Sequence, residues 1–255
     1  MPNRPLGVRG MKGQQGFTLI ELSVVLAIVG LLVGGGPMAS GPLFERAHIQ
    51  QTQQTLDQIE SALTLFVMRQ DRLPCPADGA LQPNQPLYGR EQPGAKPGAC
   101  AITDGHAVVP WVTLGLHDGL SADGWGRRIS YVPAAALTGS DHPLRRQGIT
   151  YPSGGLKVST PATPSVEITP PGEGAAYLLI SHGHDGTYGW MRAGGQIQLS
   201  GTRHPFEEAN GQGGPAFFQG SLNELRGPTH FEDVVRWRTA AFIIQSCGPA
   251  ACGNP

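Results

Sequence analysis

The composition of this chain excludes some broad classes of function before any motif is considered. It has 255 residues, a formal net charge of -1 and a pI near 6.7. The length allows one large domain or two small ones, and the near-neutral charge gives no electrostatic case for binding nucleic acid. The 37 glycines and 23 prolines predict many turns and loops.

The first distinctive element is an apolar run near the N-terminus. Residues 17–33 read FTLIELSVVLAIVGLLV, with two hydroxyl side chains and one acid, Glu21. As a helix this run would be about 25 Å long, slightly short of a ~30 Å hydrocarbon core. No other charge occurs until Glu45, so a membrane span could extend further along the chain. Of the segments that flank the run, only segment 1–16 on its N-terminal side carries basic residues (Arg4, Arg9 and Lys12), so the positive-inside rule places that leader in the cytoplasm.

Three interpretations of this run compete. A secretory signal peptide requires a small-x-small cleavage site after the run, and the proline-rich segment 37–42 is a poor one. A plain membrane anchor leaves Glu21 unexplained, because a carboxylate inside the bilayer costs about 2.5–3.5 kcal/mol on insertion scales. In a prepilin the chain is cleaved before the run, and the glutamate has a role in assembly.

The segment Gly16-Phe17-Thr18-Leu19-Ile20-Glu21 resembles the prepilin peptidase site of type IV pilins and type II secretion pseudopilins. The resemblance covers residues 10–35 or so. It implies cleavage between Gly16 and Phe17 on the cytoplasmic side, followed by N-methylation of the new Phe17 amine. Because an acid within a membrane needs a partner, Glu21 is expected to neutralise the Phe17 amine of a neighbouring subunit and to set the axial register of a filament.

The segment after the apolar run predicts a stalk. Gly30 and the stretch Gly34-Gly35-Gly36-Pro37 are expected to interrupt the helix, either as its simple end or as a hinge like that of pilins. A second helix is predicted over 37–71, with an apolar face made by Ile49, Leu56, Ile59, Leu63, Phe66 and Val67. It should end near Asp71, since Pro74 cannot continue it.

Residues 72–255 are predicted to form an exported head. Short strands are expected at Val108–Leu116, Arg128–Val132, Ala175–Ser181 and Gln196–Ser200, and the segments Val234–Trp237 and Ala241–Ile244 supply one or two more. The segments 153–174 and 205–228 read as long surface loops. The predicted fold class is therefore α+β, with a long N-terminal helix packed on a C-terminal antiparallel sheet.

The four cysteines form two local pairs, Cys75 with Cys100 and Cys247 with Cys252. An even number of cysteines in a chain with an export signal predicts disulfides in an oxidising compartment. The alternative is four reduced, buried thiols. No CxxC spacing is present, so a zinc site is not favoured.

Two turns in the head are candidate sites. Asp123-Gly124-Trp125-Gly126 resembles the aspartate-tryptophan-glycine turn of pseudopilin heads, and the simplest role for Trp125 is a core anchor. His182-x-His184-Asp185 departs from the zinc motif of metallo-β-lactamases. Major pseudopilins hold calcium, which makes Asp123 and Asp185 calcium candidates, with Glu207–Asn210 as a further source of oxygen ligands. The alternative is that both aspartates form turns by binding their own backbone.

These observations predict a structural, minor pilin-like subunit of a Gram-negative envelope rather than an enzyme, with no cofactor assigned. No G-x-S-x-G, P-loop or H-E-x-x-H motif occurs. The expected partners are the prepilin peptidase, other pilin or pseudopilin subunits, the inner-membrane assembly platform and the inner membrane itself. The expected location is the inner membrane, with a single span and a periplasmic head, and later the filament.

Two other functions stay open at this point. The first is an enzyme or ligand-binding head displayed on a pilin-like anchor, with the loop His182–Asp185 as its site. The second is a monomeric anchored periplasmic protein. The larger head, compared with major subunits of the resembled family, favours a minor subunit.

Overall fold

The computed structural model describes residues 17–35, 41–96, 98–141, 143–144, 155–198, 205–214, 216–220, 231–247 and 252. The chain divides into two compact units, Met1–Glu45 and Arg46–Pro255. The leader with Gly16, and the predicted hinge residues Gly36 and Pro37, lie outside the described residues.

The first unit contains helix α1 (Leu19–Gly35). Its apolar sequence runs through Gly30 without a break, so the predicted interruption at that glycine is wrong. One glycine costs about 1 kcal/mol of helix stability relative to alanine, and the 17-residue helix continues through it. Among the residues that the structure describes, no helix is both long and apolar enough to cross a membrane.

Helix α2 (Gly41–Gln70) follows and carries the predicted apolar face. Leu56, Ile59, Leu63 and Val67 recur at helical spacing and are all buried. The helix ends one residue before Asp71, whose φ of 53° is left-handed and closes the last turn. The predicted end of this helix is therefore confirmed.

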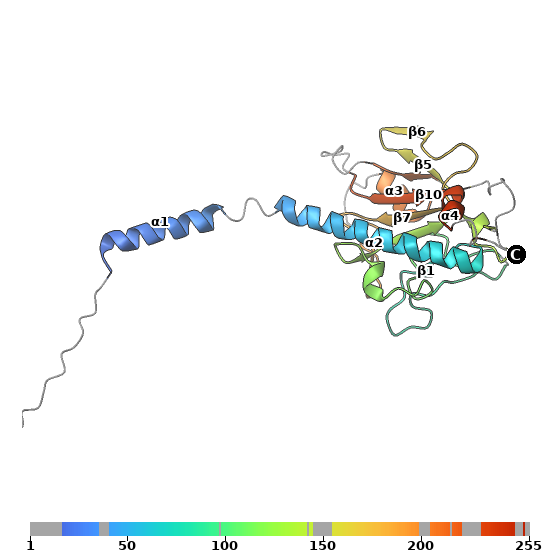
Figure 1. Ribbon diagram of the computed structural model, residues 1–255, viewed down its shortest axis with the longest axis horizontal. Helices are drawn as coiled ribbons and strands as arrows, with labels where there is room; N and C mark the ends of the chain where they lie inside the picture. The colour runs from blue at the N-terminus through green and yellow to red at the C-terminus, as the bar shows by residue number, and fades with distance from the viewer. Residues whose placement is uncertain are drawn as a thin grey trace, which may run out of the picture. The chain divides into compact units, whose positions relative to one another are not determined.

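A five-stranded antiparallel sheet forms the centre of the head. Its spatial order is β1 (Ala77–Asp78), β2 (Ala107–Val108), β4 (Ser130–Pro133), β7 (Tyr177–Ser181) and β10 (Val234–Arg238). Figure 1 shows α2 lying across this sheet. The α+β class with an N-terminal helix on an antiparallel sheet is confirmed in this unit.

The two faces of β7 pack against different layers because successive side chains of a strand point in opposite directions. Tyr177 and Leu179 join the core beneath α2, together with Tyr131 of β4 and two isoleucines of helix α4 (Ala240–Ser246). Leu178 and Ile180 face the other side and pack with Val158 and Phe217. The sheet is therefore covered on both faces.

The second layer is a three-stranded sheet with the order β6 (Thr163–Glu167), β5 (Lys157–Thr160), β9 (Ala216–Phe218). Helix α3 (Pro205–Gln212) packs against β9. A further pair joins β3 (Arg127–Arg128) to β8 (Trp190–Met191). The short 3-10 helices η2 (Asp118–Ser121) and η3 (Ala135–Leu137) connect these elements.

Several predicted elements of the head are wrong. The segment Ala241–Ile244 lies in α4, because Thr239 caps a helix by accepting a hydrogen bond from the Phe242 N–H. The strand predicted over Val108–Leu116 stops at Val108, since Pro110 begins a run of turns. The predicted loops 153–174 and 205–228 contain β5 and β6, and α3 and β9, respectively.

The predictions at Ala175–Ser181 and Val234–Trp237 are confirmed as strands, each with one end shifted, whereas Arg128–Val132 is divided between the end of β3 and most of β4. Gln196 forms a single bridge with Trp190, and the last two residues of the predicted strand Gln196–Ser200 lie outside the described residues. Both predicted cysteine pairs are bonded, each with a Cα–Cα distance of 5.4 Å.

Candidate functional site

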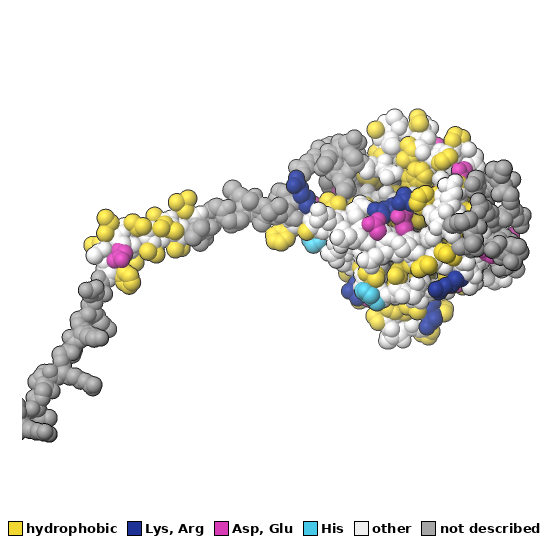
Figure 2. Space-filling model, viewed as in Figure 1, with side chains coloured by type: hydrophobic (Ala, Val, Ile, Leu, Met, Phe, Trp, Pro, Cys, Tyr) yellow, Lys and Arg dark blue, Asp and Glu magenta, His cyan; other side chains and the backbone are white. Residues whose placement is uncertain are grey.

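The N-terminal unit presents apolar side chains on every side. Phe17 is 84% exposed and Leu19 is 88% exposed, and larger aliphatic residues remain exposed along the helix as far as Leu31. Figure 2 shows this helix covered in apolar side chains, with an acidic group near its start. That acid is Glu21, in the first turn of α1. Such a surface requires an apolar environment or a partner.

Thr18 and Glu21 together cap the start of α1. The Glu21 N–H donates to Thr18 Oγ1 at 3.4 Å, and the Thr18 N–H donates back to Glu21 Oε2 at 3.5 Å. The spacing Thr-x-x-Glu is that of a capping box. Both distances lie at the long end for hydrogen bonds, so Glu21 can exchange this cap for a cationic partner at small cost.

In the second unit, Asp123 organises the turn between η2 and β3. Its Oδ1 accepts hydrogen bonds from the N–H groups of Trp125 and Arg127, at 3.0 and 2.9 Å. Its Oδ2 accepts the hydroxyl hydrogen of Ser181 at 2.7 Å. The side chain is fully buried, so the carboxylate ties the turn to the end of β7.

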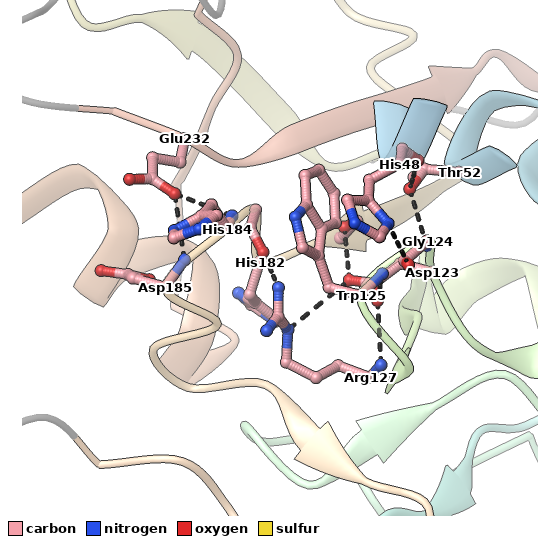
Figure 3. A network of polar contacts seen from close by, with 12 residues as sticks. His48, Thr52, Asp123, Gly124, Trp125, Arg127, His182, His184, Asp185 and Glu232 are labelled. Atoms are coloured by element: carbon pink, nitrogen blue, oxygen red, sulfur yellow. Dashed lines mark hydrogen bonds and ion pairs between the residues drawn. The ribbon is translucent and has the colours of Figure 1, made fainter. Parts of the chain in front are cut away.

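The same turn lies against the N-terminal half of α2 (Figure 3). The ring Nδ1 of His48 lies 2.6 Å from the Gly124 carbonyl oxygen, and the Gly124 N–H donates to Thr52 Oγ1 at 3.0 Å. The indole of Trp125 stacks on the His48 ring with a centroid distance of 5.6 Å. Trp125 is half-buried, so it is an anchor at the edge of the core.

Arg127 connects this turn to the loop after β7. Its guanidinium lies over the Trp125 ring at 5.6 Å, and its Nη2 donates to the Gly183 carbonyl. Glu232 holds the other side of the loop, because its Oε2 accepts the N–H groups of His184 and Asp185 at 2.7 and 3.0 Å. The polar network of Figure 3 therefore joins α2, the 123–127 turn and the 182–186 loop.

The two histidines of the 182–186 loop do not converge on one point. His182 is buried, whereas His184 is exposed. Asp185 accepts the Thr187 N–H at 2.8 Å, a turn contact within its own backbone. The described residues contain no group of three or more histidine, cysteine or acidic side chains arranged to hold a metal ion.

In the described residues both calcium candidates make the turn contacts of the alternative interpretation. Both oxygens of Asp123 accept hydrogen bonds from the chain. The predicted Glu207–Asn210 loop is part of α3 and not a loop. Asn210 uses its amide internally, donating to Phe218 O and Asp233 Oδ2 at 2.9 and 2.8 Å.

The structure also brings together a serine, a histidine and an aspartate that the sequence did not connect. Ser130 Oγ lies 2.8 Å from His182 Nε2, and His182 Nδ1 lies 3.6 Å from Asp233 Oδ1. All three residues are buried, with exposures of 6%, 1% and 2%. The row connects β4 to the residue after β7 and the residue before β10 inside the head.

Glu207 of α3 is a buried acidic residue whose pKa is affected by Asp233 of this row. Burial raises the pKa of Glu207 to about 7, and the negative charges of Asp233, Asp185 and Glu232 add to the rise. The Glu232 N–H, which donates to Glu207 Oε1 at 2.8 Å, opposes it. Glu207 is thus protonated in part of the chain population near neutral pH.

The chain combines an apolar helix with one acid in its first turn and, in the second unit, an α+β head. Residues 11–36 match the prokaryotic N-terminal methylation motif, the signature of the prepilin-type leader of type IV pilins and pseudopilins. The motif indicates a structural subunit that is processed by prepilin peptidase and assembles with other pilin subunits. Comparisons with curated proteins and with solved structures gave no match.

The sequence interpretation missed the residues that dock the 123–127 turn on α2. His48 and Thr52 are four residues apart, as are Thr52 and Leu56, so all three lie on one face of the helix. This spacing was the signal from which their contact with the head could have been predicted. Glu232 and Asp233 carried no signal of this kind, because their contacts are made across strands far apart in the chain.

Proposed function

We propose that this chain is a minor structural subunit of a type IV pilus or a type II secretion pseudopilus. The observation that supports this proposal most directly is the methylation motif over residues 11–36, with Glu21 at the fifth position after the expected cut. In this proposal the helix is the polymerising element and the head decorates the filament.

Assembly depends on a charge pair between two subunits. Cleavage after Gly16 leaves the amine of Phe17 as a cation at the depth of Glu21 in a neighbouring copy. Two charges that meet in a low-dielectric environment cancel part of each other's desolvation cost, whereas either charge alone is expensive there. Because the pair forms only at one axial offset, it also sets the register between subunits.

The exposed apolar side chains of α1 support the same proposal. Before assembly the inner membrane would cover segment 17–36, with the leader in the cytoplasm and the head in the periplasm. During assembly, the helices of neighbouring subunits would replace the lipid. The prepilin peptidase and the inner-membrane assembly platform are the partners that these two steps require.

The first test is the chemistry of the mature N-terminus. Mass spectrometry of the chain isolated from a host with prepilin peptidase should find N-methylated Phe17 as the first residue. The variant Gly16→Leu should retain the leader, because a bulky residue replaces the glycine before the cut. A wild-type chain that still begins at Met1 in that host would overturn the proposal.

The second test separates assembly from processing. Glu21→Ala should be cleaved normally but should enter sheared filaments or pseudopili at least about tenfold less than wild type, because the Phe17 amine loses its partner. Glu45→Ala is the matched control, since it removes the next acid along the chain outside the apolar run. Equal incorporation of both variants would remove the proposed role of Glu21.

A further inference from the structure

The head contains a recessed cavity of about 190 Å³ on the side of the central sheet away from α2. Its walls come from β2, β4, β9 and the segment that carries the first disulfide. The lining side chains that matter for its chemistry are Cys100, Ala107, Val132, Leu156 and Phe217.

No charged or titratable side chain occurs among the described residues that line this cavity. The wall carries two hydroxyl groups, those of the exposed Thr103 and the buried Thr138, and Thr138 Oγ1 already lies 2.9 Å from the carbonyl oxygens of Gly98 and Ala135. A charged ligand would lose its hydration here and gain no counter-ion. The chemistry of the wall therefore selects a neutral, apolar occupant.

The volume fits a molecule with a single aromatic ring. An apolar protein cavity of about 150 Å³ is large enough to bind benzene. Leu156 and Val132, both half-buried, provide aliphatic walls that a ligand can contact, and Phe217, which is 1% exposed, borders the cavity with little of its ring. Ala135 lines the cavity and is also exposed, so it marks the side open to solvent.

We propose that this cavity is a binding site for a small neutral molecule with one aromatic ring, of about the size of toluene. The site belongs to the head and shares no residue with Phe17, Glu21 or the polar network around Asp123. The cavity therefore lies outside the residues assigned to assembly, and the proposal goes beyond the structural role of the subunit.

Toluene is the probe, and the full chain in detergent micelles is the sample. Methyl-resolved NMR reports the position of the ligand, which a bulk assay cannot do because toluene also enters micelles. Saturable shifts are expected at the methyl groups of Ala107, Val132 and Leu156. The methyl groups of Ile59 and Leu63, in the core beneath α2, should not move. Benzoate has the same ring with a carboxylate and should bind at least about tenfold more weakly.

Two neighbouring alanines supply a matched pair of variants. Ala135 and Ala136 are both exposed on η3, but only Ala135 lines the cavity. Ala135→Phe should fill the entrance and weaken toluene binding at least about tenfold, whereas Ala136→Phe should leave it within about twofold. Gly214→Leu is a second filling variant, because a Cβ at Gly214 meets its nearest atom at 3.7 Å. Its effect should match that of Ala135→Phe.

The outcomes decide the proposal in either direction. Saturable toluene shifts at the cavity methyls, lost in both filling variants and kept in Ala136→Phe, support it. The absence of saturable shifts in the wild-type chain overturns it, as does equal binding of benzoate. Unchanged toluene binding in Gly214→Leu also overturns it. If Ala135→Phe disturbs the spectrum of the core beneath α2, the result for Gly214→Leu alone decides the proposal.

Discussion

Asp123 holds a turn and a strand together, although its carboxylate is fully buried. Replacing it with alanine leaves the N–H groups of Trp125 and Arg127 and the Ser181 hydroxyl without their acceptor. Each buried unsatisfied group costs about 1–3 kcal/mol, so Asp123→Ala should lower the free energy of unfolding by about 3 kcal/mol or more. Urea denaturation of the head, followed by tryptophan fluorescence, measures this change.

Asp123→Asn is the control for that prediction. The asparagine Oδ1 still accepts both backbone N–H groups, and its amide can donate to the Ser181 hydroxyl instead of accepting from it. The free energy of unfolding lost in Asp123→Asn should be less than about half of that lost in Asp123→Ala. If the two variants lose the same stability, the charge of Asp123 and not its geometry holds the turn.

Gly124 tests the docking of the same turn on α2. A Cβ at this position would overlap the backbone carbonyl of His48, which cannot move without displacing α2. Gly124→Ala should therefore cost about 1–3 kcal/mol through overpacking. Gly214→Ala should cost little in the same urea titration, because its Cβ has room. Equal losses would mean that α2 does not rest on the turn.

At the scale of elements, an acidic side chain joins α2 to the edge strand β10. Glu60 Oε2 accepts from Arg236 Nη1 at 3.3 Å and from Arg238 Nη2 at 2.9 Å, and Oε1 accepts the Tyr177 hydroxyl hydrogen at 3.3 Å. Burial raises the pKa of Tyr177, so this hydroxyl stays protonated and donates. One carboxylate thus connects the helix to two strands.

Glu60→Ala should destabilise the head by about 2 kcal/mol, between the values typical of exposed and of buried ion pairs, because its side chain is 15% exposed. Asp57→Ala removes a second Arg236 partner that is 68% exposed and should cost less than about 1 kcal/mol. Thermal unfolding at low and at high salt compares the two. A loss in Asp57→Ala as large as that in Glu60→Ala would contradict this explanation.

The elements differ in how well the sequence predicts them, for physical reasons. Helix α2 was predictable because a long amphipathic run has one period and a proline beyond its end. Helix α4 was not, since its seven residues include β-branched and aromatic types, and the cap at Thr239 decides its conformation. Strand β6 is exposed throughout and contains Pro164, so it lacks the alternation that identifies a half-buried strand.

The candidate functional residues differ in the same way in how well the sequence predicts them. The proposed roles of Phe17 and Glu21 could be read from local sequence, because the matching motif is a linear segment of the chain. The network around Asp123 could be predicted only as a turn. Its partners His48, Ser181 and Glu232 come from elements distant in the chain, and sequence spacing does not report such contacts.

For the molecule as a whole, the raised pKa of Glu207 makes stability depend on pH. Burial is the main cause of the value near 7, compared with 4.5 in an unfolded chain. Because the folded state binds this proton more tightly, its stabilising effect is complete below about pH 4.5 and is lost as the pH rises through 7. The head should therefore lose stability over this range.

Glu207→Gln removes that pH dependence while keeping an oxygen acceptor for the Glu232 N–H. The Tm of the variant minus that of the wild type should therefore increase from pH 5 to pH 8. Scanning calorimetry across this range measures the difference. A Tm difference that is constant with pH, or one that decreases, would show that Glu207 is not the group responsible.

The two disulfides should contribute unequally to the stability of the whole head. Cys75 and Cys100 are 25 residues apart, whereas Cys247 and Cys252 are 5 apart. In the chain-entropy model these loops restrict the unfolded chain by about 3.5 and about 2 kcal/mol at 25 °C. Double alanine variants of each pair, compared by urea denaturation, should show the larger loss for the first pair. The first pair also borders the apolar cavity, so its removal should weaken toluene binding as well, whereas removal of the second pair should not. An equal loss of stability in the two variants would mean that the folded-state contacts of the cysteines, and not loop length, set their contribution.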